Sequence, residues 1–191
     1  MSRPPSWFRR LLSPLIGRGH GLARDEAGAT AVEFGLLALP FFTIIFAIVE
    51  TSMVFFAGQI LDSAVNDASR RLRTREAQSA GETAADFRAA ICQRLYGLFD
   101  CADTDKLRIK VSEVTAFSDA LPTAPMACNE DKSACDWALA EAYNAGQASS
   151  VLLVEAYYKW PTIVNLPGFD FANLPDGTRL LSAVRVFRNE P

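Results

Sequence analysis

The chain has 191 residues, half of them hydrophobic, and a formal net charge of −3. This length allows one membrane anchor and one modest folded domain, and the acidic balance of residues 62–191 argues against nucleic acid as a partner. The single histidine is His20, so the chain beyond it has no imidazole for a Ser-His-Asp or Cys-His catalytic centre or for a zinc site that contains histidine.

Residues 1–28 form a basic segment. They hold five arginines against Asp25 and Glu26, a net charge of +3, whereas residues 62–191 carry a net charge of −4. The positive-inside rule predicts that the basic end stays in the cytoplasm and that the C-terminal part crosses the membrane. Four arginines between residues 70 and 75 oppose this orientation, but large domains translocate largely regardless of charge.

An apolar run extends from Phe34 to Ala57 and contains one charged residue, Glu50. As an α-helix its 24 residues extend about 36 Å, enough to cross a hydrocarbon core of about 30 Å. Pro40 predicts a kink or a locally opened turn within this membrane-spanning helix. Two interpretations fit Glu50, which lies about 26 Å beyond Glu33 along the helix: an acid at the outer membrane interface, or a polar contact with a partner helix.

Glu33 lies in the first turn of the expected helix, where a carboxylate costs free energy. If the chain is cut between Gly28 and Ala29, the new α-amino group lies four residues before Glu33, one turn away on the same helical face. This amine, or that of a neighbouring subunit, can then neutralise the carboxylate. An ordinary signal peptide fits less well, because its small-residue cleavage site follows the apolar core, whereas Ala27 and Ala31 precede the run. An uncleaved anchor also fits.

The sequence Gly28-Ala29-Thr30-Ala31-Val32-Glu33-Phe34 resembles the prepilin-peptidase site of Flp-type pilins. The longer stretch from Glu26 to Pro40, followed by Val49-Glu50, resembles the TadE-like pseudopilins of tight-adherence (Tad) pilus systems. The ending Phe187-Arg188-Asn189-Glu190-Pro191 resembles the C-terminus of the same family. The N-terminal resemblance covers about residues 24–52, and the middle of the chain carries no matching motif.

This resemblance implies a minor pilin-like subunit that a prepilin peptidase cuts between Gly28 and Ala29. Its helix would hold it in the inner membrane, with the N-terminus in the cytoplasm and the C-terminal domain in the periplasm. There it would prime, cap or help to assemble a pilus. The implied partners are other pseudopilins, the inner-membrane proteins of pilus assembly and the lipid bilayer, and Glu33 would serve in subunit docking.

The helix is expected to continue outside the membrane. Apolar residues recur at helical spacing opposite a polar face, which indicates an amphipathic helix. The apolar stripe consists of Ile60, Leu61, Ala64, Val65, Ala68 and Leu72. Because such a stripe must be buried, it predicts packing on the chain's own C-terminal domain or, equally, on a partner subunit.

The remaining chain predicts a small α+β domain with a pilin-like order of elements. Apolar residues at helical spacing indicate a short helix, and alternating or β-rich runs indicate an antiparallel sheet. The expected elements are a helix over 83–98, strands over 106–116, 150–160 and 178–187, and loops over 122–133 and 161–177, the last packed over the sheet. The expected organisation is a leader over 1–28, the helix and its extension over 29–80, and a periplasmic domain over 81–191.

Four cysteines lie beyond the anchor: Cys92, Cys101, Cys128 and Cys135. An even number fits disulfides in an oxidising periplasm, and the short intervening loops favour the pairs Cys92–Cys101 and Cys128–Cys135. A zinc site of four cysteines is the alternative. However, such sites usually place about two to four residues between paired cysteines, and the gaps here are eight and six residues.

No motif indicates a cofactor, a metal or a catalytic residue. The main hypothesis is therefore a structural or interaction protein of a Tad pilus. The alternative is an uncleaved, signal-anchored periplasmic binding or scaffold module of an envelope complex. An anchored enzyme is the least favoured interpretation, because the chain beyond residue 28 has no histidine.

Overall fold

The computed structural model describes residues 26–163, 165–166 and 169–191. Residues 1–25, which hold His20 and most of the expected leader, lie outside the described part. The chain divides into two compact units, Met1–Ala47 and Ile48–Pro191. Within the first unit, the described residues are all helical.

Three α-helices are described. They are α2 (Glu26–Arg73), α3 (Glu76–Ser79) and α4 (Ala84–Arg94). Helix α2 has 48 residues and continues through Pro40. It ends where Arg75 adopts a left-handed conformation with φ of 62°, which a helix cannot continue through. The long apolar helix predicted from the sequence is confirmed.

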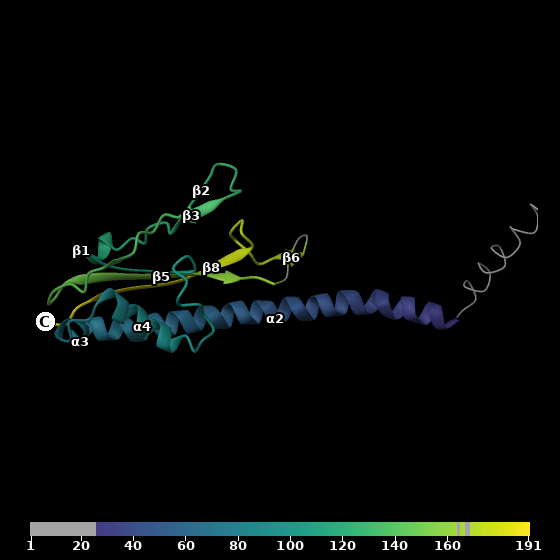
Figure 1. Ribbon diagram of the computed structural model, residues 1–191, viewed down its shortest axis with the longest axis horizontal. Coiled ribbons are helices and arrows are strands. Elements are labelled where there is room, and N and C mark those ends of the chain that lie inside the picture. The colour runs from purple at the N-terminus through teal and green to yellow at the C-terminus, as the bar shows by residue number, and fades with distance from the viewer. Residues whose placement is uncertain (1–25, 164, 167–168) are drawn as a thin grey trace, which may run out of the picture. The chain divides into compact units, whose positions relative to one another are not determined.

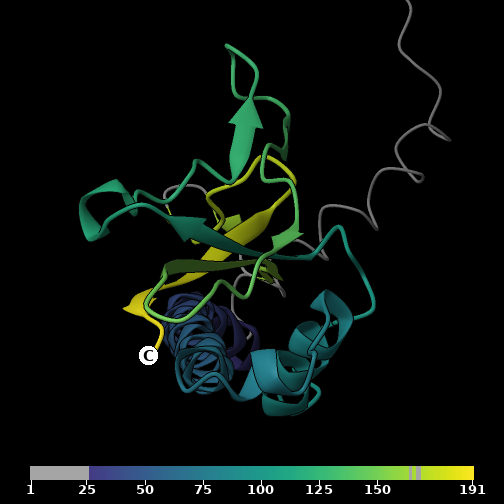
Figure 2. The same ribbon diagram turned by 90° about the vertical axis from the view of Figure 1, so that its left-hand side faces the viewer.

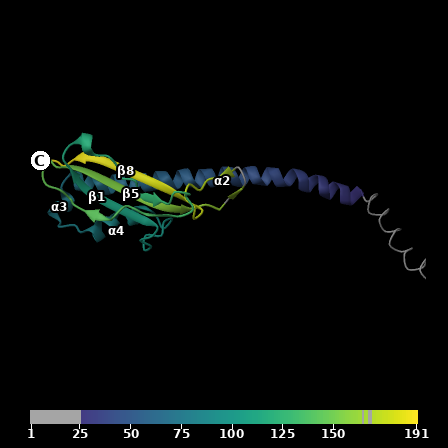
Figure 3. The ribbon, with the colours of Figure 1, turned by 90° about the horizontal axis from the view of Figure 1, so that it is seen from above.

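The strands are β1 (Leu107–Val114), β2 (Met126–Cys128), β3 (Cys135–Trp137), β4 (Ala142–Tyr143), β5 (Val151–Pro161), β6 (Asn165–Leu166), β7 (Phe169–Asp170) and β8 (Thr178–Arg188). A 3-10 helix, η1 (Phe117–Asp119), follows β1. The main sheet has the order β4-β1-β5-β8, and Figure 3 shows its three longer strands side by side. Both β1 and β8 pair antiparallel with β5, whereas β4 is parallel to β1. The α+β fold with a mainly antiparallel sheet is as predicted.

One face of the sheet packs on the helices of the second unit, as the end-on view in Figure 2 shows. The whole predicted stripe of α2 contributes: five of its residues are buried and Ile60 is partly buried. Leu61 and Leu72 have no exposed surface, and burying each stabilises the fold by about 1.5–3 kcal/mol. The core also contains Leu107 and Val111 from β1. The stripe is therefore buried on the chain's own domain.

The opposite face of the sheet is covered by the chain between β1 and β5. Here β2 and β3 pair as a hairpin, which lies on the side of the sheet away from α2 (Figure 1). Residues of β5 on this face are as deeply buried as those on the helical face; Leu153 and Tyr157, for example, are 3% and 4% exposed. Strand β5 is thus enclosed on both faces.

Three details of the sequence-based expectation are wrong. Helix α4 ends at Arg94 because Tyr96 and Gly97 adopt left-handed conformations, so Leu98 is not on its buried face and is 37% exposed. The expected loop 122–133 contains β2, and the expected loop 161–177 contains β6 and β7. These strands are too short to give an alternating pattern in the sequence.

Candidate functional site

The Gly28–Ala29 peptide lies in the helical backbone near the start of α2. Because the helix is continuous from Glu26, Ala29 and Glu33 stand one turn apart on one face. Gly28 and Glu33 are both exposed. Within the part of the chain that the structure describes, Glu33 forms no ion pair. Its carboxylate is therefore accessible to a cationic partner such as the α-amino group predicted at residue 29, one helical turn away.

The described residues of the first unit expose a continuous apolar surface. Large side chains on every side of the helix are more than one-third exposed, among them Phe34, Leu37, Phe41 and Ile44. The polar Thr43 bonds back into the helix, its hydroxyl donating to the carbonyl of Leu39 at 2.8 Å. By length and hydropathy, α2 can cross a membrane, so it is suited to act as an anchor.

Glu50 lies in the second unit and is 7% exposed. Its Oε1 accepts a hydrogen bond at 2.6 Å from the backbone N–H of Ile163, which follows β5. Glu50 therefore binds the chain's own domain. Neither interpretation offered by the sequence included this contact, because it joins residues 113 positions apart.

The two disulfides predicted from the sequence are present. Cys92 at the end of α4 is bonded to Cys101, and Cys128 in β2 is bonded to Cys135 in β3. The first bond ties α4 to the loop that leads into β1, and the second closes the β2–β3 hairpin. Both lie in the second unit, beyond the apolar part of α2.

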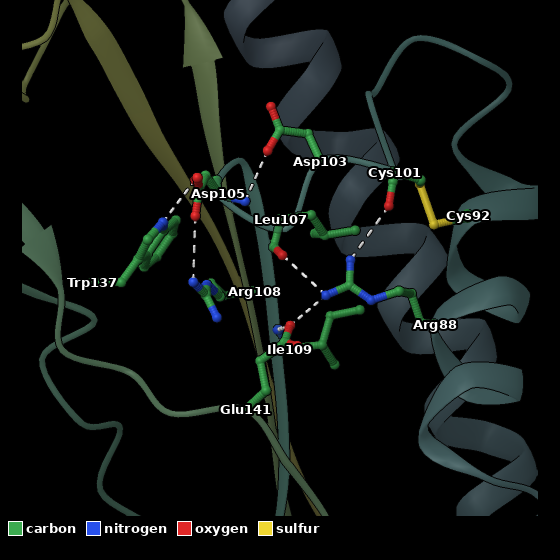
Figure 4. A network of polar contacts seen from close by, with 10 residues as sticks. All are labelled: Arg88, Cys92, Cys101, Asp103, Asp105, Leu107, Arg108, Ile109, Trp137 and Glu141. Carbon is green, nitrogen blue, oxygen red and sulfur yellow. Dashed lines mark hydrogen bonds and ion pairs between the residues drawn. A yellow bond between two sulfur atoms is a disulfide. The ribbon is translucent and has the colours of Figure 1, made fainter.

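Arg88 and Glu141 close part of the free edge of β1, as Figure 4 shows. Arg88 donates to the carbonyl of Leu107 at 3.1 Å, and the Glu141 carboxylate accepts from the N–H of Ile109 at 3.1 Å. The two side chains also form an ion pair with each other. They satisfy backbone groups of β1 just before its pairing with β4 begins, and so protect this edge from pairing with another chain.

Trp137 anchors the β2–β3 hairpin to the sheet. Its indole N–H donates to the carbonyl of Asp105 at 2.7 Å, a bond that Figure 4 also shows. The cationic groups of Arg108 and Lys159 lie 5.8 Å and 5.4 Å from the centre of its ring, within the range of cation–π attraction. No pattern in the sequence indicates this role, because Trp137, Arg108 and Lys159 come from three different strands.

Glu155 is a fully buried acid in the middle of β5. Its Oε1 accepts from the N–H of Thr123 at 3.1 Å and from the hydroxyl of Tyr157 at 3.2 Å. Lys110 lies directly opposite on β1, with its ammonium 3.9 Å from Oε2. Burial, together with the Glu155 charge, raises the pKa of Tyr157 to about 12, so that this phenol stays protonated and donates at neutral pH. Both hydrogen bonds go to Oε1, and Oε2 has no hydrogen-bond donor among the described residues, only the Lys110 charge beside it. All of these partners belong to the same domain, which indicates a structural role.

Within the described residues, no three His, Cys, Asp or Glu side chains are grouped closely enough to hold a metal ion. Two of the described grooves lie along α2 and β8. One of about 440 Å³ is lined by residues that include Val54, Phe55, Phe171 and Arg179. Of the sequence-predicted residues, the structure joins the cysteines in their pairs and places Gly28, Ala29 and Glu33 at the start of α2. Glu50 lies farther along the same helix, in the second unit.

The comparisons with known proteins agree with the features of α2. The model of the TadE-like protein family matches residues 28–70, a range that includes Gly28, Ala29, Glu33 and Glu50. The resemblance to TadE-like pseudopilins is therefore confirmed for this part of the chain. A search of curated proteins and a search of solved structures found no match.

Proposed function

We propose that this chain is a membrane-anchored minor pilin or pseudopilin that takes part in the assembly of a Tad (Flp-type) pilus. The observation that carries the proposal is the family match over residues 28–70, on a helix whose exposed apolar surface suits a membrane. In this proposal the protein is not an enzyme and needs no cofactor. It acts through contacts with other subunits, and its partners include a prepilin peptidase and inner-membrane assembly proteins.

The anchor would place the protein in the inner membrane with a cytoplasmic N-terminus. The net charge of +3 in residues 1–28 supports this orientation, since basic segments remain in the cytoplasm. The two disulfides of the second unit support a periplasmic domain, because such bonds persist in oxidising compartments. Arg88 and Glu141 at the edge of β1 would help to keep this domain from aggregating before assembly.

Processing at Gly28–Ala29 would prepare the subunit for docking. The new amine of Ala29 is protonated at neutral pH, because its reference pKa is near 8. It would lie within one turn of Glu33 in the same subunit or a neighbour. Gly28 favours this cut in two ways. It has no side chain that a confined peptidase site would have to exclude. It also weakens the start of the helix by about 1 kcal/mol relative to alanine, so that the Gly28–Ala29 peptide can unwind from the helix for cleavage.

The intact mass of the purified protein tests the proposal. We expect an N-terminus at Ala29 in cells that contain the peptidase, and we expect Gly28→Val to leave a full-length precursor in the membrane. Gly35→Val is the matched control, because a Cβ at Gly35 meets no atom within 4 Å and the residue lies beyond the cut. If Gly28→Val is still trimmed to the same mass, the proposed site is wrong. An intact leader in the unaltered protein would favour an uncleaved anchored binding or scaffold module.

A further inference from the structure

The folded domain packs on a part of α2 that still belongs to the apolar run. Val54 and Ala57 are 8% and 1% exposed and join the domain core. Met53, Phe55 and Phe56, which alternate with them along the helix, are 43%, 69% and 55% exposed. One side of this segment is therefore covered by protein, and the other side presents large apolar groups.

Ile163 lies beside the same segment. Its backbone N–H donates to Glu50, and Glu50 lies seven residues, or about 10 Å of helical rise, before the end of the apolar run at Ala57. Its side chain is 91% exposed, the most exposed of the large hydrophobic residues that the structure describes. The turn at Ile163 therefore carries an apolar group at a level of the helix that a membrane would surround.

The hydrogen bond between Glu50 and Ile163 reduces the free-energy cost of placing a carboxylate and a backbone N–H near a membrane. A backbone N–H without a partner is costly in hydrocarbon, and so is a charged carboxylate, although the cost of the carboxylate falls toward the membrane boundary. Here each group satisfies the other at 2.6 Å.

A groove on the neighbouring surface combines the chemistry of the lipid interface. Its lining includes Phe55 and Phe171, together with Arg179. One guanidinium nitrogen of Arg179 donates to the backbone carbonyl of Phe171 at 3.0 Å, which ties this cation to the chain that follows β7. Aromatic and basic side chains together are typical of the zone where acyl chains meet phosphate headgroups.

We propose that the turn at Ile163 is a second, non-spanning contact with the bilayer that α2 crosses. The Ile163 side chain inserts into the interfacial zone of the outer leaflet, and Glu50 holds the turn at that depth. Lipid is the partner because Ile163 is bonded to Glu50, inside the apolar run of α2, where Met53, Phe55 and Phe56 are exposed as well. Two points of attachment restrict the tilt of the domain relative to the membrane, whereas one helix alone would leave that tilt variable. This inference rests on the membrane anchoring proposed above.

The test uses the full chain in vesicles of phosphatidylethanolamine and phosphatidylglycerol. Because all four native cysteines are in disulfides, a new cysteine can be labelled alone with an environment-sensitive fluorophore. Three variants carry the label: Ile163→Cys in the turn, Ile48→Cys in the helix, and Leu121→Cys as the matched control. Leu121 is 76% exposed and lies on the chain that follows η1, away from Glu50.

Lipids that carry a spin label near the glycerol end of the acyl chain then quench any fluorophore at the interface. We expect the labels at residues 163 and 48 to emit at shorter wavelength and to lose most of their intensity, and the label at residue 121 to do neither. Quenching at 48 without quenching at 163 overturns the second contact and leaves the anchor intact. No quenching at 48 overturns the anchor itself. A shorter emission wavelength at 163 without lipid quenching identifies a protein occupant and also overturns the inference.

Variants of Glu50 test how the turn is held. Glu50→Gln keeps a side-chain oxygen that can accept the hydrogen bond, so lipid quenching of the label at 163 should persist. Glu50→Ala removes the acceptor, and the quenching should fall while that at 48 remains. Equal quenching at 163 in the two variants would show that Glu50 does not set the depth of the turn.

Discussion

Helix α2 carries two acids with different surroundings: Glu33 just before the apolar run and Glu50 within it. Glu50 is almost fully buried and accepts a hydrogen bond from Ile163. Glu33 is exposed and lies one turn from the proposed new N-terminus. A buried acid with a partner in its own chain stabilises the fold of that chain. An exposed acid beside an apolar surface can instead bind a neighbouring subunit.

Replacing Glu33 should therefore affect assembly rather than membrane insertion. Glu33→Leu makes the helix more apolar, so insertion should be unimpaired. A protonated Ala29 amine would then lack its carboxylate in a low-dielectric setting, which is costly. We expect the variant to be made, inserted and stable, yet to give no pili and to co-purify poorly with its partner subunits.

Glu33→Asp is the matched control for this experiment, because it keeps the carboxylate on a shorter side chain. It should retain part of the assembly and of the partner recovery. Normal piliation with Glu33→Leu would show that Glu33 is a tolerated boundary residue without a docking role.

The partners of single residues were harder to predict from the sequence than the residues themselves. The sequence indicates Glu33 and the Gly28–Ala29 bond as candidates because their spacing is local, within one turn of a helix, and their roles stay predictions. The partner of Glu50 could not be found, since the contact depends on how the turn after β5 meets α2. Glu155 looks like one acid in an ordinary strand, and its burial follows only once β5 is covered on both faces.

Helix α4 begins with a capping box, which gives it a defined start. The Thr83 hydroxyl accepts from the N–H of Asp86 at 3.3 Å, and the Asp86 carboxylate accepts from the N–H of Thr83 at 2.9 Å. The hydrogen bonds from the side chain and the backbone of Thr83 lower the pKa of Asp86. A carboxyl whose pKa is lower in the folded state stabilises the fold above its unfolded pKa, near 4, and loses that effect as the pH falls through its folded pKa.

Thr83→Ala should reduce the free energy of unfolding by about 1 kcal/mol at neutral pH. The variant also removes one of the bonds that lower the Asp86 pKa. When the pH is lowered below about 4, the free energy of unfolding should therefore decrease less in the variant than in the unaltered protein. Thermal unfolding of the full chain in detergent across this pH range measures both effects. Thr104→Ala, at an exposed threonine of the loop before β1, should change neither. An unchanged unfolding temperature in Thr83→Ala would contradict a stabilising cap.

The two disulfides should be fully formed in the mature protein. Each closes a short loop, with sequence separations of 9 and 7 residues, and in the chain-entropy model each contributes about 2 to 3 kcal/mol. Thiol labelling under denaturing, non-reducing conditions should detect no free cysteine, and the paired change Cys128→Ser with Cys135→Ser should lower the unfolding temperature. Four labelled thiols or stoichiometric zinc would contradict this prediction.

Elements with a local periodic signal were predicted well. The stripe of α2 and the alternation in β1 identify one buried face each, and both faces meet in the core. Strand β4 has only two residues and pairs parallel to β1, which no pattern in its own sequence indicates. The same limit applies to the β2–β3 hairpin, which depends on a disulfide and on the position of Trp137.

At the scale of the whole chain, the distribution of charge supports the proposed orientation. Residues 1–28 have a net charge of +3 and residues 62–191 one of −4, which favours a cytoplasmic N-terminus. Of the arginines that follow the apolar run, Arg71 pairs with Glu82 at 3.2 Å and Arg73 lies 3.9 Å from Glu190. These pairs do not remove the opposing bias, because the positive-inside rule counts Lys and Arg and acidic residues contribute little to it.

A reporter fused after Pro191 tests this orientation. Alkaline phosphatase, which is active only after export, should be active there, and a cytoplasmic β-galactosidase fusion at the same place should be inactive. Replacing Arg9, Arg10, Arg18 and Arg24 together with glutamine leaves the arginines beyond the helix as the larger positive group, so phosphatase activity should fall as part of the population inverts. Arg70→Gln is the control, because it removes an exposed charge from the side expected to be exported and should preserve the activity. Full phosphatase activity in the four-arginine variant would mean that export of the folded domain, and not the leader charge, determines the orientation.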